Sequence, residues 1–319
     1  MTQSASSVIL VRPKGFGYDP ETATSNAFQR RMDDLEVKRL AAEEFDALLD
    51  ALRRIGVAAT VLDPVDPGAP NAVFPNNWFS THADGTVVIY PMLTPSRRRE
   101  RDPDLKATMG REGFHVLQVM DLAQWEDQEL ILEGTGSLVL DRIHRRAYAC
   151  LSPRTSEAAL NAWCEQLGYT PVPFTATMDG TLTGQAVYHT NVVMSIGTAF
   201  AVVCFEAMPY PGERSEVLRE LQGTGRQVIP ITLEQMHRYV GNMLELSSAL
   251  SVVGPASAGQ PTTANHILLS QTAFEALTTD QRQALQSHAR LVPVSIPTIE
   301  AVGGGSVRCM LAENFLSRA

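Results

Sequence analysis

The feature that most restricts the fold is a recurring pattern of elements. Two strands, a helix and a further strand follow one another, and this grouping is repeated along the chain. Apolar residues at helical spacing over 35–55, followed by an apolar strand over 57–62, give one instance. A second runs through a strand at 145–151, a helix at 156–167 and an extended segment at 169–174. The grouping returns roughly every 50 to 70 residues, and every proline-rich link is short. We therefore predict a single α/β domain over residues 1–319, built of repeated ββαβ units.

Local signals predict the remaining elements. Glycine at a chain reversal between two apolar runs is typical of a hairpin, and glycine inside an apolar run interrupts it. The predicted elements are hairpins at Asp84-Gly85 and Gly197-Thr198, a basic helix over 95–113, a strand over 114–120, an interrupted strand over 130–140 and strands around 243–253.

Composition excludes several classes of protein. Hydrophobic residues make up 44% of the 319 residues, and charged residues 19%, as in a fully folded protein. A formal net charge of −9 argues against nucleic-acid or anionic-membrane partners, and the cluster Arg97-Arg98-Arg99-Glu100-Arg101 is the local exception. No window reaches the roughly 18 apolar residues of a membrane span. We expect a cytoplasmic protein whose partner is a small molecule. Whether the protein forms a homo-oligomer is left open by the sequence.

The four cysteines and the glycines give no sign of a cofactor. Cys150, Cys164, Cys204 and Cys309 form no CxxC pair and no metal-finger spacing, so we predict no metal and no disulfide framework. There is no GxGxxG after a first strand and no GxxxxGK[ST], so no nucleotide cofactor is predicted.

One of these cysteines stands in an unusual place. Cys309 closes the segment Gly303-Gly304-Gly305-Ser306-Val307-Arg308-Cys309. Glycines are expected where the backbone takes unusual dihedral angles or passes close to a ligand. Cys309 is therefore a candidate nucleophile, and the alternative is a small buried apolar residue behind a loop.

Two further residues could assist a thiol. Glu133 lies in an otherwise apolar run followed by glycines, and a buried carboxylate is costly unless it is paired or used. His189 precedes the apolar run 192–194, where it is either a base or a hydrogen-bonded core residue. A protonated imidazole beside a thiol would lower the thiol pKa and create the attacking thiolate.

Four motifs in order carry a resemblance to a known family. They are Phe74-Pro75-Asn76-Asn77, Leu132-Glu133-Gly134-Thr135-Gly136, His189-Thr190-Asn191 and the glycine-cysteine segment 303–309. The chain resembles the guanidino-group-modifying enzymes, which include arginine deiminase, amidinotransferase and dimethylarginine dimethylaminohydrolase. Within them the segments FPNNWFSTH, YPMLTPSRRRER, LEGTGSLVLD and GGGSVRCMLAENF are most similar to the citrulline utilisation hydrolases. The resemblance implies a five-bladed pseudosymmetric α/β propeller, the pentein fold, around a central site.

The resemblance also implies roles. Cys309, His189 and Glu133 are then the catalytic residues. Arg154 matches the arginine that holds the substrate α-carboxylate, with Arg97 or Arg98 as a second, because guanidinium forks bind carboxylates in pairs of hydrogen bonds. Three consecutive arginines on one helix cannot all face one site, so a solvated surface is the alternative for 97–99. The substrate-binding set is completed by Phe74, Asn77, Asn191 and Asn242.

Asn77 and Asn191 are departures from the family pattern. Arginine-processing relatives have aspartates there, which suit a cationic guanidinium. A carboxamide is uncharged and offers both a donor and an acceptor, so the pair suits a neutral ureido group, unless Asn77 is only a turn residue.

The predicted function is that of a cofactor-free cysteine hydrolase. It would act on the ureido C–N bond of citrulline and give ornithine, ammonia and carbon dioxide through a covalent thiol adduct. One alternative is the same chemistry on arginine or another guanidine, as in an arginine deiminase or amidinotransferase. A second is a pentein that serves as a non-catalytic binding module.

Overall fold

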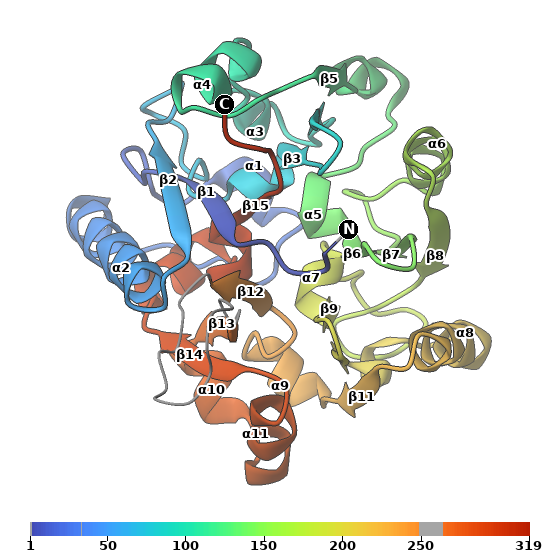
Figure 1. Cartoon of the computed structure of the whole chain (residues 1–319). Helices are drawn as coiled ribbons and strands as arrows, with labels where there is room; N and C mark the ends of the chain where they lie inside the picture. Colours follow the sequence, from blue (N-terminus) through green and yellow to red (C-terminus); the bar gives the residue numbers. More distant parts are fainter. Residues whose placement is uncertain (1, 33, 249–263) are drawn as a thin grey trace, which may run out of the picture.

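Five small sheets of three strands each surround one axis in the computed structural model of the chain (Figure 1). The structure describes residues 2–32, 34–248 and 264–319. In every sheet the first two strands are antiparallel, and the second and third are parallel across a helical connection. This is the predicted ββαβ repeat, and the five-bladed α/β propeller is confirmed.

Four of the units follow one another along the chain. Their strands are β3 (Phe79–Thr81), β4 (Thr86–Ile89) and β5 (Gln118–Asp121); β6 (Val139–Asp141), β7 (Arg146–Cys150) and β8 (Thr170–Phe174); β9 (Met194–Ile196), β10 (Phe200–Val203) and β11 (Gln227–Pro230); and β12 (Leu244–Ser248), β13 (Ala264–Ser270) and β14 (Arg290–Val294). Their connecting helices are α3 (Pro95–Arg98) with α4 (Leu105–Arg111), α6 (Glu157–Leu167), α8 (Pro211–Gly223), and α10 (Gln271–Ala276) with α11 (Thr279–Gln286).

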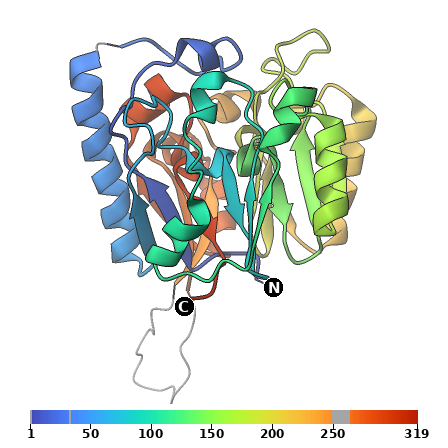
Figure 2. The same cartoon turned by 90° about the horizontal axis from the view of Figure 1, so that it is seen from above.

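The two ends of the chain build the fifth unit together. β1 (Ser7–Val11) pairs with β15 (Ala312–Asn314) on one side and with β2 (Ala58–Leu62) on the other, across α2 (Asp34–Arg54). This pairing closes the ring. It places both termini on one face of the propeller, whereas α1 (Pro20–Ala23) lies on the opposite face (Figure 2).

Local sequence explains why the long connecting helices form. Ser156 caps α6 by accepting a hydrogen bond from the Ala159 N–H, and Gly168 ends it in the left-handed region at φ 68°. The side chains of Thr278 and Gln281 close a reciprocal capping box at the start of α11. The long helices α2, α6, α8 and α11 lie on the outer rim and pack apolar residues inward against their sheets (Figure 1).

Three local predictions were wrong. The basic helix expected over 95–113 is divided into α3 and α4, because Pro103 in the break lacks the N–H that a continuous helix needs. The strand expected over 130–140 contains the helical turn α5 (Gly134–Ser137), so Glu133 precedes a turn and is not within a strand. The strand expected at 114–120 begins only at β5.

Short helical turns also precede the first strands of other units. They are the 3-10 turns η1 (Pro75–Asn77) and η5 (Val307–Met310) and the turn α7 (Thr190–Val193), so His189 precedes a turn too. The other short helices are α9 (Leu233–His237), the 3-10 turns η2 (Ala123–Gln128) and η3 (Phe205–Ala207), and the π-helical η4 (Ile299–Gly303). Of the strands expected around 243–253, residues 249–253 lie outside the described part.

Within the described residues, no helix has the length and apolar character needed to cross a bilayer. Nor do three or more His, Cys, Asp or Glu side chains gather there as metal ligands would.

Candidate active site

Predicted catalytic and binding residues from all five units meet at the propeller axis, with Arg98 as the exception. Each unit contributes the segment just before its first strand: η1, α5, α7, the turn before β12 and η5. η1 contacts both α5 and η5, and α5 contacts α7. The five segments therefore bring Asn77, Glu133, His189, Asn242 and Cys309 together from positions spread over the chain.

A small cavity of about 10 Å³, room for about one water molecule, lies among these segments. Of the predicted residues, Phe74, Asn77, Arg97, Arg154, His189 and Cys309 line it. It is also lined by Thr22, Asn26, Gln29, Asn71, Tyr188, Gly303, Gly304 and Gly305.

Glu133 is the buried centre of a charged network. Its Oε2 lies 2.8 Å from His189 Nε2 and 3.5 Å from Arg154 Nη1, and its Oε1 accepts a hydrogen bond of 3.1 Å from the Leu93 N–H. Burial by itself raises the pKa of Glu133, but Arg154 and His189 outweigh it and lower the pKa to about 2. Glu133 is thus a carboxylate that orients the His189 ring.

His189 differs from the sequence-based expectation in its charge. Its side chain is 2% exposed, and burial lowers its pKa from 6.5 to about 4 in spite of the hydrogen bond to Glu133. The imidazole is therefore neutral at pH 7 in the free protein. Burial thus acts against the protonated resting form that we expected, which stays a prediction.

Cys309 receives two hydrogen bonds from carboxamides. Asn242 Nδ2 donates to Sγ at 3.3 Å and Asn191 Nδ2 at 3.5 Å. Burial raises the pKa of Cys309, and these donors with the Ser306 backbone offset only part of that rise. The resting pair is a neutral thiol and a neutral imidazole on the wall of one cavity.

Glycines let the segments approach closely. Gly134 has φ +48°, and a Cβ there would lie 2.3 Å from the Asn76 carbonyl oxygen. A Cβ on Gly136 would lie 2.3 Å from Asn77 Nδ2 and 2.8 Å from His189 Nδ1. A Cβ on Gly303 would lie 2.7 Å from ring carbons of Phe74. The glycines that marked these motifs in the sequence are needed for contact across the axis.

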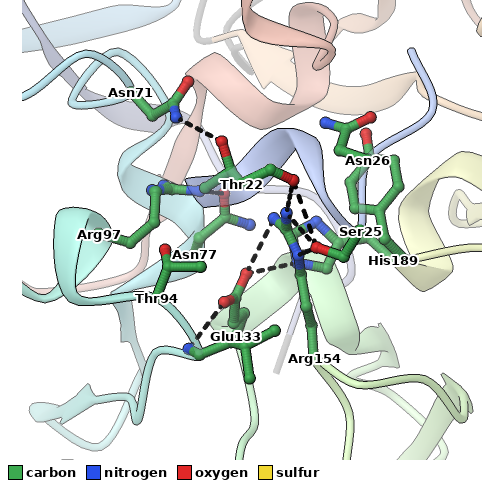
Figure 3. Close-up of polar contacts among 12 residues, drawn as sticks. Thr22, Ser25, Asn26, Asn71, Asn77, Thr94, Arg97, Glu133, Arg154 and His189 are labelled. Carbon is green, nitrogen blue, oxygen red and sulfur yellow. Dashed lines mark hydrogen bonds and ion pairs between the residues drawn. The ribbon is translucent and has the colours of Figure 1, made fainter. Parts of the chain in front are cut away.

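Arg154 joins the catalytic network to the segment between β1 and α2. Its guanidinium donates to the Thr22 carbonyl oxygen at 2.9 Å and to Ser25 Oγ at 2.8 Å, and lies against Glu133 (Figure 3). Asn26 Nδ2 donates to the Gly304 carbonyl oxygen at 3.1 Å, and Gln29 Nε2 donates to that of Gly303 at 3.0 Å. This segment therefore covers the cavity.

Sequence reasoning missed the covering segment and Tyr188. The polar character of the residues before Asn26 was the only signal, and it does not distinguish a loop over a site from any other loop. Tyr188 lies against the cavity next to His189, and its hydroxyl donates to the Gly304 carbonyl oxygen.

The two candidate arginines of α3 occupy different places relative to the cavity. The Arg97 side chain is 3% exposed and reaches Asn77, Glu100 and the cavity. Arg98 instead donates to the carbonyl oxygens of Met92 and Leu93 and pairs with Glu126, outside the cavity lining. The structure does not bring Arg98 into the site, because adjacent helical residues point in different directions, and we propose no substrate contact for it.

Sequence comparison adds a family to this geometry. The family described as N,N dimethylarginine dimethylhydrolase, eukaryotic, matches residues 12–316. The chain belongs to this family. The matched span covers nearly the whole chain, and no curated protein gives a significant match to it.

Several solved structures share the fold of this chain. The N-terminal domain of ArgZ bound to substrate, an arginine dihydrolase from the ornithine-ammonia cycle in cyanobacteria, is 14% identical, with a TM-score of 0.71 and 96% of each chain covered. The same domain covalently bound to a reaction intermediate gives 14% identity, a TM-score of 0.68 and 96% coverage of each chain. A dimethylarginine dimethylaminohydrolase adduct with 4-chloro-2-hydroxymethylpyridine is 14% identical, with a TM-score of 0.63, covering 97% of this chain and 100% of the other. These likenesses confirm the pentein fold.

Proposed function

We propose that this dimethylhydrolase-family protein is a cysteine hydrolase that cleaves the ureido C–N bond of citrulline and gives ornithine, ammonia and carbon dioxide. The observation that carries the proposal is the orientation of the Asn77 amide. Asn77 Oδ1 accepts hydrogen bonds from Arg97 Nη1 and Nη2, both at 3.2 Å. A guanidinium has donors only, so the amide must turn its oxygen to Arg97.

The NH₂ group of Asn77 is therefore the part left for the ligand. Asn77 Nδ2 is buried and has no hydrogen-bond partner among residues 2–32, 34–248 and 264–319. A ureido group presents a carbonyl oxygen that can accept from it. A guanidinium presents only N–H donors, which cannot form a hydrogen bond with the Asn77 NH₂ donor.

Asn191 has the complementary polarity. Its Nδ2 faces two acceptors, Cys309 Sγ and the Thr135 carbonyl oxygen, each at 3.5 Å. Its Oδ1 is buried and unpaired within the described part of the chain. The two amides thus leave one free donor on the cavity wall, at Asn77, and one free acceptor beside Cys309, at Asn191, which does not itself line the cavity. A ureido group needs a donor and an acceptor.

The charges around the cavity favour a neutral side chain. Its lining includes Arg97 and Arg154 and, among the described residues, no carboxylate. Glu133 is already bound by His189, Arg154 and the Leu93 N–H. A cationic side chain would therefore enter without a free counter-ion, whereas an α-carboxylate would meet guanidinium groups.

The chemistry begins with neutral partners. His189 takes the thiol proton as Cys309 Sγ bonds to the ureido carbon, and it returns that proton to the departing nitrogen as the C–N bond breaks. Either amine can leave, and each leaves a thiocarbamate on Sγ. Water then loses a proton to His189 and adds to the thiocarbamate, the C–S bond breaks, and the released carbamate decomposes to carbon dioxide and the second amine. Glu133 stabilises the imidazolium formed in each step.

A guanidino substrate is the second candidate. It is favoured by the fold shared with ArgZ, which is described as an arginine dihydrolase. In this alternative, Cys309 is the nucleophile of an arginine deiminase or amidinotransferase reaction.

Purified protein incubated with citrulline and arginine in parallel distinguishes the two. Ornithine and ammonia formed from citrulline, with little turnover of arginine, are the expected result. Citrulline formed from arginine, without ornithine formed from citrulline, would refute the proposal.

Replacing Cys309 tests whether the protein is a hydrolase that uses this residue as its nucleophile. Cys309→Ser should lower kcat for citrulline by about three orders of magnitude or more and should still bind citrulline. Full activity in this variant would place the nucleophile elsewhere. Binding without turnover by the wild-type protein would favour the non-catalytic pentein module.

A further inference from the structure

We propose a second ligand site, beside the axial cavity, that takes a cationic amino acid such as ornithine and regulates turnover at the axial site. It is a cavity of about 460 Å³, within the roughly 300 to 1,000 Å³ usual for small-molecule pockets. The regulatory part of the inference rests on the proposed function, in which ornithine is a product. The lining residues that carry the inference are Phe28, Arg30, Met178, Tyr239, Thr272 and Glu300, and none of these lines the axial cavity.

Glu300 is a buried carboxylate without a cationic partner. It is 5% exposed, and it accepts hydrogen bonds of 2.7 Å from Thr272 Oγ1 at Oε2 and from Ser306 Oγ at Oε1. The buried carboxylates of Glu133 and Asp141 each pair with an arginine, whereas no ion pair among the described residues includes Glu300. Burial raises the pKa of Glu300, and a bound cation would offset that rise. This wall of the cavity therefore favours a ligand with an ammonium or guanidinium group.

The other walls suit the remainder of such a ligand. The rings of Phe28 and Tyr239 lie in the lining with their centroids 4.9 Å apart, and aromatic rings bind both aliphatic chains and cations. Arg30 is exposed at the cavity, and its guanidinium can hold a carboxylate through two hydrogen bonds. A carboxylate, a carbon chain and a cationic end together describe a basic α-amino acid.

Charge separates the product of the proposed reaction from its substrate at this second site. Ornithine ends in a δ-ammonium that can pair with Glu300, whereas the ureido end of citrulline is neutral. Bound citrulline would leave the Glu300 carboxylate without a counter-ion. We therefore expect the second cavity to prefer ornithine over citrulline.

The covering segment between β1 and α2 borders both cavities. Asn26 and Gln29 line the axial cavity, and Phe28 and Arg30 line the second one. The axial cavity has room for about one water molecule. The covering segment must therefore shift before citrulline can enter, and a ligand bound to Arg30 would oppose that shift.

Glu300 joins the second cavity to the segment that carries the nucleophile. It lies in η4, and its Oε1 accepts from Ser306, three residues before Cys309. The Arg30 N–H donates to the Ala301 carbonyl oxygen at 2.7 Å, so η4 and the covering segment are already in contact here. A ligand with its carboxylate on Arg30 and its ammonium on Glu300 would tie the two segments together and keep the axial cavity closed. The expected consequence is slower turnover.

Steady-state kinetics with citrulline as the substrate test the regulation. At saturating citrulline, ornithine should lower kcat of the wild-type protein by about fivefold, the lower end of typical coupling between two sites. Norvaline, which lacks only the δ-amine, should be a competitive inhibitor alone. Arg30→Gln should lose the effect of ornithine on kcat, because a missing charged partner should weaken binding at the second cavity by about tenfold or more.

Arg31→Gln is the matched control. It removes the same charge one position along the chain, from an exposed side chain that lines neither cavity. Ornithine should lower kcat of this variant as it does in the wild-type protein.

Equilibrium dialysis with labelled ornithine measures the second site without turnover. Arg30→Gln should bind one molecule fewer per chain than the wild-type protein and Arg31→Gln. Met178→Trp places a larger side chain in the second cavity from another segment and should show the same loss. It takes the place of Arg30→Gln if that variant does not fold.

Three results would overturn the inference. They are equal ornithine stoichiometry in the wild-type protein and both cavity variants, purely competitive inhibition of the wild-type protein by ornithine, and the same loss in Arg31→Gln as in Arg30→Gln. Wild-type protein that is inactive on citrulline would refute the proposed function, whereas dialysis would still decide whether the second site exists.

Discussion

Replacing Asn77 by aspartate should reverse the polarity that the site presents to its ligand. The change keeps the size of the side chain and the acceptor towards Arg97, which Asn77 Oδ1 now provides at 3.2 Å. It replaces the free NH₂ group by a carboxylate oxygen beside the buried space that Gly136 leaves open. A citrulline oxygen would then lose its donor and face a second acceptor.

The expected magnitude follows from these two losses. A missing hydrogen bond together with an unpaired buried acceptor corresponds to about 2 to 4 kcal/mol. This is about a thirtyfold to thousandfold fall in kcat/KM for citrulline. Arginine, which offers donors only, should gain relative to citrulline because the new carboxylate accepts from it.

Initial rates with both substrates across a range of concentrations measure this change. Asn77→Ser serves as the control, because it removes the amide without adding a charge. It should weaken turnover of citrulline without favouring arginine. The proposed role of the Asn77 amide would be refuted if Asn77→Asp kept the wild-type kcat/KM for citrulline. It would also be refuted if both variants changed kcat/KM for citrulline and for arginine by the same factor.

Two further predictions concern packing and pH. Gly136→Ala should lower kcat/KM by about a hundredfold or more, because its Cβ would lie 2.3 Å from Asn77 Nδ2, whereas Gly110→Ala, with open space at that position, should leave activity unchanged. Equal effects of the two alanines, measured at matched protein stability, would contradict this. Burial lowers the pKa of His82 from 6.5 to about 3, so below pH 6.5 the unfolded chain binds one more proton there and stability falls as the pH falls, by about 1.4 kcal/mol per pH unit. His82→Gln should flatten this dependence by about one proton in urea unfolding at pH 7 and pH 5, and an unchanged slope would show that His82 is not its source.

Much of the fold could be predicted because its signals are local. The apolar spacing of α2 and the capping residues of α6 and α11 lie within the elements they define. The recurrence of strand, strand, helix and strand then indicated repeated ββαβ units, and the resemblance to the guanidino-group-modifying enzymes implied their arrangement as a five-bladed propeller. β15 escaped prediction, since three residues carry too little pattern and pair only with β1 at the other end of the chain.

The sequence by itself determined which side chains are the candidates for the chemistry. Cys309, His189, Glu133 and Asn77 stand next to glycines or in ordered motifs, and these features can be read without coordinates. Tertiary structure decided their state. The neutral charge of His189 arises from burial at the axis, and the direction of the Asn77 amide arises from Arg97, twenty positions away. Dielectric environment and hydrogen-bond direction depend on neighbours from other units, so only the closed ring of five units fixes them.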